Sequence, residues 1–222
     1  MNKTLQRLGG AAAVMEGLLY VAGMIYFILV VDYMSVSGAE ARVQLLVDNL
    51  IGLIAINTLI YIVFGVALVV LAVALHERLS PLQPALMQLA SAFGIIWAGV
   101  VIVAGMLFNL GAEQAVLLNA KDSAAAGDYW HIIDTVHQAM GGGVEILGGL
   151  WMLFVSLAGL RGKEFPGILN WLGLLVGFAG TITLIPPLSE IGGIFFGLGQ
   201  IVWFLWIGIL MMIRSAGPAS AP

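Results

Sequence analysis

Six long apolar stretches dominate this 222-residue chain. A helix needs about 20 mostly apolar residues to cross the hydrocarbon core of a bilayer, and each stretch is that long. None has a polar face wide enough to lie against water. The sequence therefore predicts an all-α, polytopic transmembrane helix bundle in a cell membrane. The predicted spans are Leu8–Val31, Leu50–Leu75, Pro84–Leu110, Ala139–Leu160, Ile168–Leu188 and Ile191–Ile213.

The composition excludes most other classes of protein. Charged residues make up 9% of the chain and hydrophobic residues 61%, whereas a soluble domain has about 25% charged residues. A soluble domain, a disordered chain and a nucleic-acid-binding protein are excluded. The absence of cysteine excludes disulfides, thiolate metal sites and iron–sulfur clusters. No nucleotide-binding loop is present, so the expected surroundings are lipid, without nucleotide or nucleic acid.

The distribution of basic residues predicts the orientation of the bundle. Cytoplasmic loops of membrane proteins are enriched in Lys and Arg. If the sides alternate from the N-terminus, six basic residues fall on one side and two on the other. Six spans with both termini cytoplasmic fit this asymmetry. The first span is too long for a cleaved signal core, so we expect one transmembrane domain over residues 1–214 and a flexible tail over 215–222. The cytoplasmic set is Lys3, Arg7, Arg78, Arg161, Lys163 and Arg214, and the outer set is Arg42 and Lys121.

The fourth span has an unusually polar face. On one continuous helix, Asp134, Gln138, Gly141 and Glu145 fall on the same side. Ionisable groups inside a membrane are expensive and point into the bundle. Glu16 is a second acid, within the first span. We therefore predict ligand binding by Glu16, Glu145, Gln138 and Asp134. The alternative is that either glutamate is a neutral, hydrogen-bonded tie between helices.

The outer end of the fourth span offers candidate metal ligands. His131, Asp134 and His137 recur every three residues, and imidazole with carboxylate suits Zn, Cu or Fe. One helix cannot direct all three side chains at one ion, so Glu190 or Asp48 would have to contribute from elsewhere. The hypothesis is a divalent metal there; any other cofactor is unknown. The alternative is a His–Asp cluster hydrogen-bonded to nearby loops.

Glycine spacing predicts a close helix pair. Gly173 and Gly177 lie four residues apart in the fifth span, and Gly193 and Gly197 have the same spacing in the sixth. Small residues at this spacing let membrane helices approach closely. We therefore expect these two spans to form a tight hairpin.

Two segments carry a family resemblance. One is the string from Gly141 to Glu145 followed by Gly149-Leu150-Trp151; the other comprises Leu184–Pro187 and Gly199–Gly208. Both resemble bacterial six-helix integral membrane proteins grouped only as a domain of unknown function. The resemblance implies a fold and a membrane location, and it implies that Glu145 belongs to a recurring segment. It implies no reaction.

Three functions are compatible with these patterns. The first is binding of a small ligand or ion within the bundle, for transport or sensing. The second is a structural or accessory role in a larger complex, with other membrane subunits or a second copy as partners. The third is a metal-dependent membrane enzyme that uses the His–Asp cluster. Because no Ser/His/Asp arrangement or HExxH motif is present, the enzyme ranks last.

Overall fold

A computed structural model describes residues 2–33, 35–142 and 145–213. These residues form helices joined by turns, without a β-strand among them, so the predicted all-helical fold is confirmed. Arg214 and the predicted tail, 215–222, lie outside the described residues. The elements are α1 (Lys3–Ile25), η1 (Tyr26–Val30), α2 (Ala39–Asn57), η2 (Thr58–Val63), α3 (Phe64–Leu79), α4 (Pro84–Asn119), α5 (Ser123–His137), η3 (Gln138–Gly142), α6 (Ile146–Gly162), α7 (Gly167–Ile182), η4 (Pro186–Leu188) and α8 (Ser189–Ile213).

The helical runs have the dimensions of a membrane protein. In the described part of the chain, five runs are long and apolar enough to cross a bilayer, while the apolar helix α7 is shorter. Many large apolar side chains are exposed along these runs, for example Ile51 and Phe195. Their exposure indicates contact with lipid. The five runs are Lys3–Val30, Ala39–Leu79, Pro84–Asn119, Ser123–Gly162 and Pro186–Ile213.

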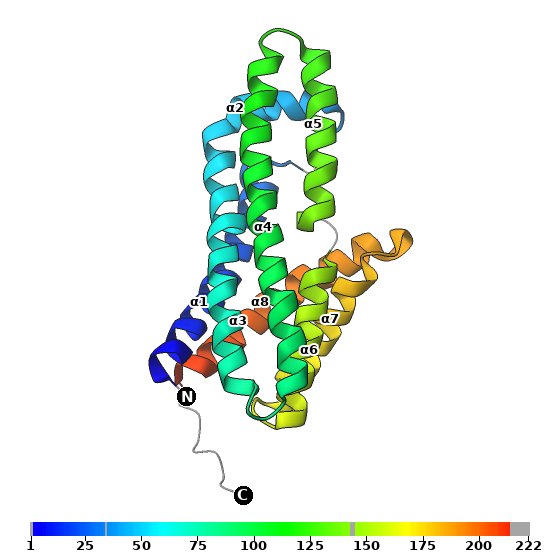
Figure 1. The fold of residues 1–222 in the computed structure, drawn as a ribbon. Helices are drawn as coiled ribbons and strands as arrows, with labels where there is room; N and C mark the ends of the chain where they lie inside the picture. Colours follow the sequence, from blue (N-terminus) through cyan, green and yellow to red (C-terminus); the bar gives the residue numbers. More distant parts are fainter. Residues whose placement is uncertain (1, 34, 143–144, 214–222) are drawn as a thin grey trace, which may run out of the picture.

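The first and last helices lie side by side. Figure 1 shows the blue start of α1 beside the red end of α8, and Gly10 on α1 faces Gly208 and Met212 on α8. We call this end of the bundle the basal end. The opposite end, where α4 turns into α5, is the apical end (Figure 1).

Two hydrophobic cores are stacked along the bundle. The basal core unites α1, α3, α6, α7 and α8 around Trp151, whose ring lies 5.7 Å from each of the Trp97 and Trp203 rings. The apical core is smaller and joins α2, α4 and α5 around Phe108 and Trp130. Helix α4 contributes to both cores because its 36 residues extend for about 54 Å.

Glycines bring several pairs of helices into backbone contact. A Cβ added at Gly208 would lie 2.6 Å from the carbonyl oxygen of Gly10, and one at Gly149 would lie 2.8 Å from that of Gly177. The predicted fifth and sixth spans, α7 and α8, do pack closely, since a Cβ at Gly192 would lie 2.8 Å from the Ala179 carbonyl oxygen. The glycines predicted to make this contact on the sixth span were wrong, because a Cβ at Gly193 or Gly197 would meet nothing within 4 Å.

A buried ion pair closes the basal end. Arg78 on α3 donates to Glu164, in the α6–α7 turn, over 2.8 Å and to the Gln6 side-chain oxygen on α1 over 3.2 Å. Its guanidinium also lies 4.8 Å from the centre of the Phe165 ring. Gln6 in turn donates to the Ala74 carbonyl over 2.9 Å. These bonds join three segments that are distant in the sequence.

Helix separation can be tested at Gly208. Gly208→Ala places a methyl group against the Gly10 backbone, and overpacking of this kind costs about 1–3 kcal/mol. We expect a lower Tm in detergent, followed by circular dichroism. Gly197→Ala on the same helix adds its methyl group in open space and should leave the Tm unchanged or raise it. Equal Tm values for the two variants would contradict the backbone contact.

The basal ion pair gives a second stability prediction. Arg78→Met removes the buried partner of the pair and leaves the partly exposed Glu164 without its counter-ion and Gln6 without its donor, which costs about 1–3 kcal/mol. The expected result is a large fall in Tm or in the yield of monodisperse protein. Arg161→Met removes the same charge from an exposed position near the same end and should change little. Similar losses in both variants would show that net charge, and not the pair, stabilises the fold.

Candidate functional site

The fourth predicted span is interrupted in its middle. Helix α5 ends at His137, a π-helical turn follows, and α6 begins only at Ile146. Gly141 has φ +115°, which a residue with a side chain rarely adopts. Gly143 and Val144 lie outside the described residues. The expectation of one continuous helix from Asp134 to Glu145 was wrong, because the glycine run favours a change of direction over helical continuation.

Helix α7 supports the second side of this break. The Glu145 N–H donates to Thr183 Oγ1 over 2.8 Å, and the Thr183 hydroxyl donates to the Gly180 carbonyl over 2.7 Å. Glu145 is therefore fixed at the residue that precedes α6. Its carboxyl group lies at the N-terminus of a 17-residue helix, where the helix dipole favours negative charge.

A cavity of about 220 Å³ lies beside the break. Glu145 lines it together with Tyr20 from α1, Tyr61 from η2, Phe64 from α3 and Trp97 from α4. Among the described lining residues, Glu145 alone carries a carboxyl group, and none is Lys, Arg or His. The cavity therefore combines one acid with an aromatic wall.

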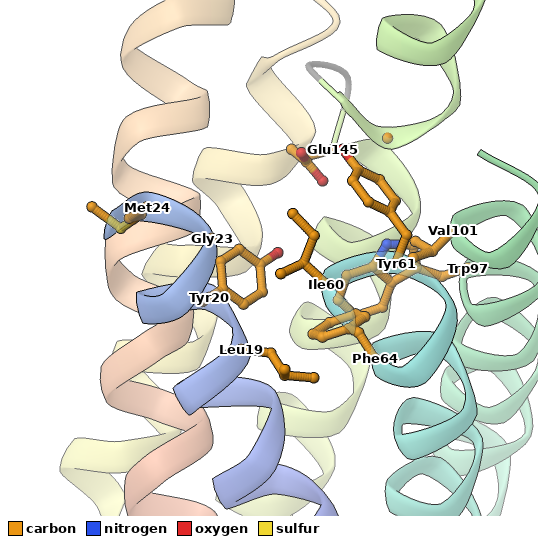
Figure 2. Close-up of a pocket in the computed structure, with 11 residues that line it drawn as sticks. Leu19, Tyr20, Gly23, Met24, Ile60, Tyr61, Phe64, Trp97, Val101 and Glu145 are labelled. Carbon is orange, nitrogen blue, oxygen red and sulfur yellow. The ribbon is translucent and has the colours of Figure 1, made fainter. Parts of the chain in front are cut away.

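The side chains around the cavity converge on its interior. Figure 2 shows Glu145 at one side, the Tyr20 and Tyr61 rings flanking the space, and the Tyr20 hydroxyl directed into it. The Phe64 ring lies 5.5 Å from that of Tyr20 and 5.7 Å from that of Trp97, both edge-to-face. Tyr61 belongs to a π-helical turn, a deviation that occurs frequently at functional sites.

The four predicted ligand-binding residues do not form one site. Glu145 lines the cavity, and Glu16 lies wholly buried on α1, outside the lining. Asp134 is near the apical end, where its Oδ2 accepts from Arg42 Nη1 over 3.0 Å. Gln138 is exposed on η3. Of the four, Glu145 is the one that lines the cavity among the described residues.

The three predicted metal ligands point to different surroundings. His131 is exposed, Asp134 pairs with Arg42, and His137 is buried with Nδ1 3.2 Å from the Ala104 carbonyl oxygen. Across the part of the chain that the structure describes, no three His, Asp or Glu side chains are close enough to hold a metal ion. The two residues suggested as additional metal ligands, Asp48 and Glu190, are exposed and lie elsewhere. The Asp48 carboxylate accepts a hydrogen bond from Gln44, and Glu190 lies in the first turn of α8.

The apical ion pair has an aromatic neighbour. The Arg42 guanidinium lies 5.5 Å from the centre of the Tyr33 ring. Burial raises the pKa of the Tyr33 hydroxyl and the nearby Asp134 carboxylate raises it further, while the neighbouring Trp130 side chain and the Arg42 cation oppose the rise. Tyr33 therefore remains neutral. The Arg42–Asp134 ion pair joins α2 to α5.

Sequence reasoning missed the aromatic wall and the residues that position Glu145. Tyr20 and Tyr61 lie inside apolar stretches, and a tyrosine buried there must place its hydroxyl group somewhere polar. The presence of tyrosine within these apolar stretches therefore already indicated a polar site. No sequence signal connects Thr183 with Glu145 or Arg42 with Asp134, because 38 and 92 residues separate these partners.

The fold and cavity define a helical membrane protein with a polar site inside its bundle. The chain belongs to the family described as "Domain of unknown function (DUF4386)", whose family model matches residues 15–213. The resemblance to an uncharacterised family is thereby confirmed, and the match covers most of the chain. No curated protein and no solved structure matches it.

The break gives a prediction at Gly141. Gly141→Ala forces a side chain into a left-handed backbone conformation, which costs about 1–2 kcal/mol. We expect a lower Tm than that of the unchanged protein. Gly99→Ala on α4 meets nothing within 4 Å and, because alanine favours helix, should be neutral or stabilising. A Tm for Gly141→Ala equal to that of Gly99→Ala would contradict the strained turn.

Proposed function

We propose that this protein binds a small organic cation in the cavity, with Glu145 as its counter-ion, and transports it across the membrane. One observation carries the proposal: the described lining has one carboxyl group, an aromatic wall and no basic side chain. An anion would meet repulsion from Glu145 without a compensating positive charge. A cation would find charge neutralisation and ring faces.

The chemistry of the lining favours an organic ammonium ion over a metal ion. A cation over the face of Trp, Tyr or Phe gains about 2 kcal/mol when desolvated. Ca²⁺ requires six to eight oxygen ligands, while the cavity presents the Glu145 carboxylate and the hydroxyl groups of Tyr20 and Tyr61. A volume of about 220 Å³ also exceeds the space that a bare ion fills.

The depth of the cavity supports a role in transport. Between Gln88 and Glu113, the exposed side chains of α4 are all apolar. The stretch Leu89–Leu110 extends for about 33 Å, close to the ~30 Å thickness of the hydrocarbon core. Trp97 and Val101, which line the cavity, lie near its middle. We infer that Glu145 lies near the bilayer midplane, where transporters place binding sites beside interrupted helices.

The charges at the two ends support an orientation. Lys3, Arg7 and Arg78 lie at the basal end together with Arg161 and Lys163 of the α6–α7 region, whereas the apical end carries Arg42 and Lys121. The excess of basic residues on cytoplasmic surfaces favours a cytoplasmic basal end. Both the N-terminus and the end of α8 would then face the cytoplasm.

Equilibrium binding to the purified protein tests the proposal. We expect saturable binding of quaternary ammonium probes, from tetramethylammonium to tetraethylammonium. Glu145→Gln keeps the shape of the side chain and removes its charge, so affinity should fall at least tenfold, or about 1.4 kcal/mol. The matched control is Glu190→Gln, which removes the same charge from the exposed start of α8.

Two results would overturn the cation site. One is the absence of saturable binding for every probe in the series. The other is equal affinity of the Glu145→Gln and Glu190→Gln proteins, which would show that the carboxyl group in the cavity does not contribute to binding.

A further inference from the structure

Building on the proposed function, we propose that Glu16 is a second carboxyl station, which exchanges a proton with Glu145 as the cation moves between them. Inward movement of one cation would then accompany outward movement of one proton. The protein would be a cation/proton exchanger with two stations in series, Glu145 beside the break and Glu16 toward the basal end.

The surroundings of Glu16 do not stabilise a negative charge on its carboxyl group. Its side chain is 0% exposed, and neither carboxyl oxygen has a hydrogen-bond partner within the described residues. The ion pairs found there join Arg42 to Asp134 and Arg78 to Glu164, so neither neutralises Glu16. Burying an unpaired charge in an apolar interior costs far more free energy than an ordinary packing contact contributes. A bound proton or a bound cation removes that cost.

Tyr20 connects the two carboxyl groups. It lies one helical turn beyond Glu16 on α1 and lines the cavity with Glu145. Its hydroxyl is directed into the cavity that Glu145 lines (Figure 2). A phenol hydroxyl can accept one proton while it donates its own, which makes Tyr20 a suitable relay.

The neighbouring helices leave Glu16 electrostatically isolated. Helices α8 and α3 and the turn η2 pack against α1, with a smaller contact from α2. Within the described chain, the titratable group on η2 is Tyr61. On α3 and α8 the charged or titratable groups lie near the helix ends: His76, Glu77 and Arg78 on α3, and Glu190 on α8. Helix α2 carries Glu40 and Arg42 in its first turn and Asp48, which is exposed, in its middle.

A second polar group lies at a similar depth. Gly17, the residue after Glu16, faces Ile201 and Leu205 on α8. Gln200, which precedes Ile201, is 0% exposed, and both of its side-chain polar atoms lack partners in the described structure. Gln200 therefore supplies uncommitted polar atoms at the depth of the Glu16–Tyr20 turn. Gln6 and the Arg78 ion pair close the bundle beyond Glu16, at the basal end.

The exchange step conserves charge and protons. Initially the cation neutralises the Glu145 carboxylate, and Glu16 carries a proton. As the cation moves to Glu16, the Glu16 O–H bond breaks, Tyr20 accepts that proton and donates its own, and a new O–H bond forms on Glu145. Release of the cation at the basal side lets Glu16 take a proton from that side. Binding of the next apical cation releases the Glu145 proton.

Transport in proteoliposomes tests the exchange. The probe is radiolabelled tetramethylammonium, which has no N–H proton to carry, and the lumen contains the pH dye pyranine. The unchanged protein should take up the probe while the lumen becomes more alkaline by one proton per cation. Because this exchange is electroneutral, an imposed membrane potential should not change the rate.

The variants separate Glu16 from the cation site. Glu16→Gln cannot ionise, so proton counterflow should be lost. Tyr20→Phe removes the relay hydroxyl and should slow exchange at saturating probe at least tenfold; it also tests the path should Glu16→Gln fail to fold. Glu113→Gln, an exposed acid on α4, is the matched control and should exchange normally.

The outcomes distinguish this inference from the proposed function. Absence of probe binding and uptake in the unchanged protein would overturn the cation site itself. Uptake without alkalinisation, uptake that follows the membrane potential, or intact counterflow in a folded Glu16→Gln protein would overturn the exchange alone. Loss of counterflow in Glu16→Gln and slowed exchange in Tyr20→Phe would support it.

Discussion

The structure depends on the cost of leaving a polar group without a partner in hydrocarbon. In lipid each such group costs several kcal/mol, so irregular backbone inside a membrane is tolerated only where protein or a polar cavity surrounds it. The break between α5 and α6 satisfies this condition. Thr183 binds the freed N–H of Glu145, and the cavity takes its carboxyl group. The same constraint applies to Glu16, whose buried carboxyl group faces the interior of the bundle and not lipid.

Helix packing around this site uses two different devices. In the basal core, glycines let α1 approach α8 and α6 approach α7 until their backbones touch, which replaces the hydrophobic driving force that lipid does not provide. At the two ends, the ion pairs of Arg42 and Arg78 join segments that are distant in the sequence. The cavity lies between the glycine contacts and the ion pairs, and its lining side chains are bulky and aromatic.

The sequence was sufficient for the helical class and the membrane location. Length and hydropathy determine those features, because a 20-residue apolar stretch has few alternatives. The break was not predicted, because a helical projection assumes a continuous helix and hides the effect of three successive glycines. The grouping of His131 with His137 was expected from spacing alone, whereas the interior position of His137 depends on α4. Gly193 and Gly197 show that equal spacing does not identify the contacting face.

The π-helical turn η2 adds a consequence for chain length. A π-helical turn accommodates an extra residue within an otherwise α-helical run, here between α2 and α3. Deleting one residue from the α-helical parts of this run, outside η2, would rotate everything that follows by about 100° about the helix axis. Phe64 would turn from the cavity and Arg78 from Glu164. Insertions and deletions in this run are therefore more damaging than substitutions that preserve its hydrophobicity, since they alter both ends of the bundle simultaneously.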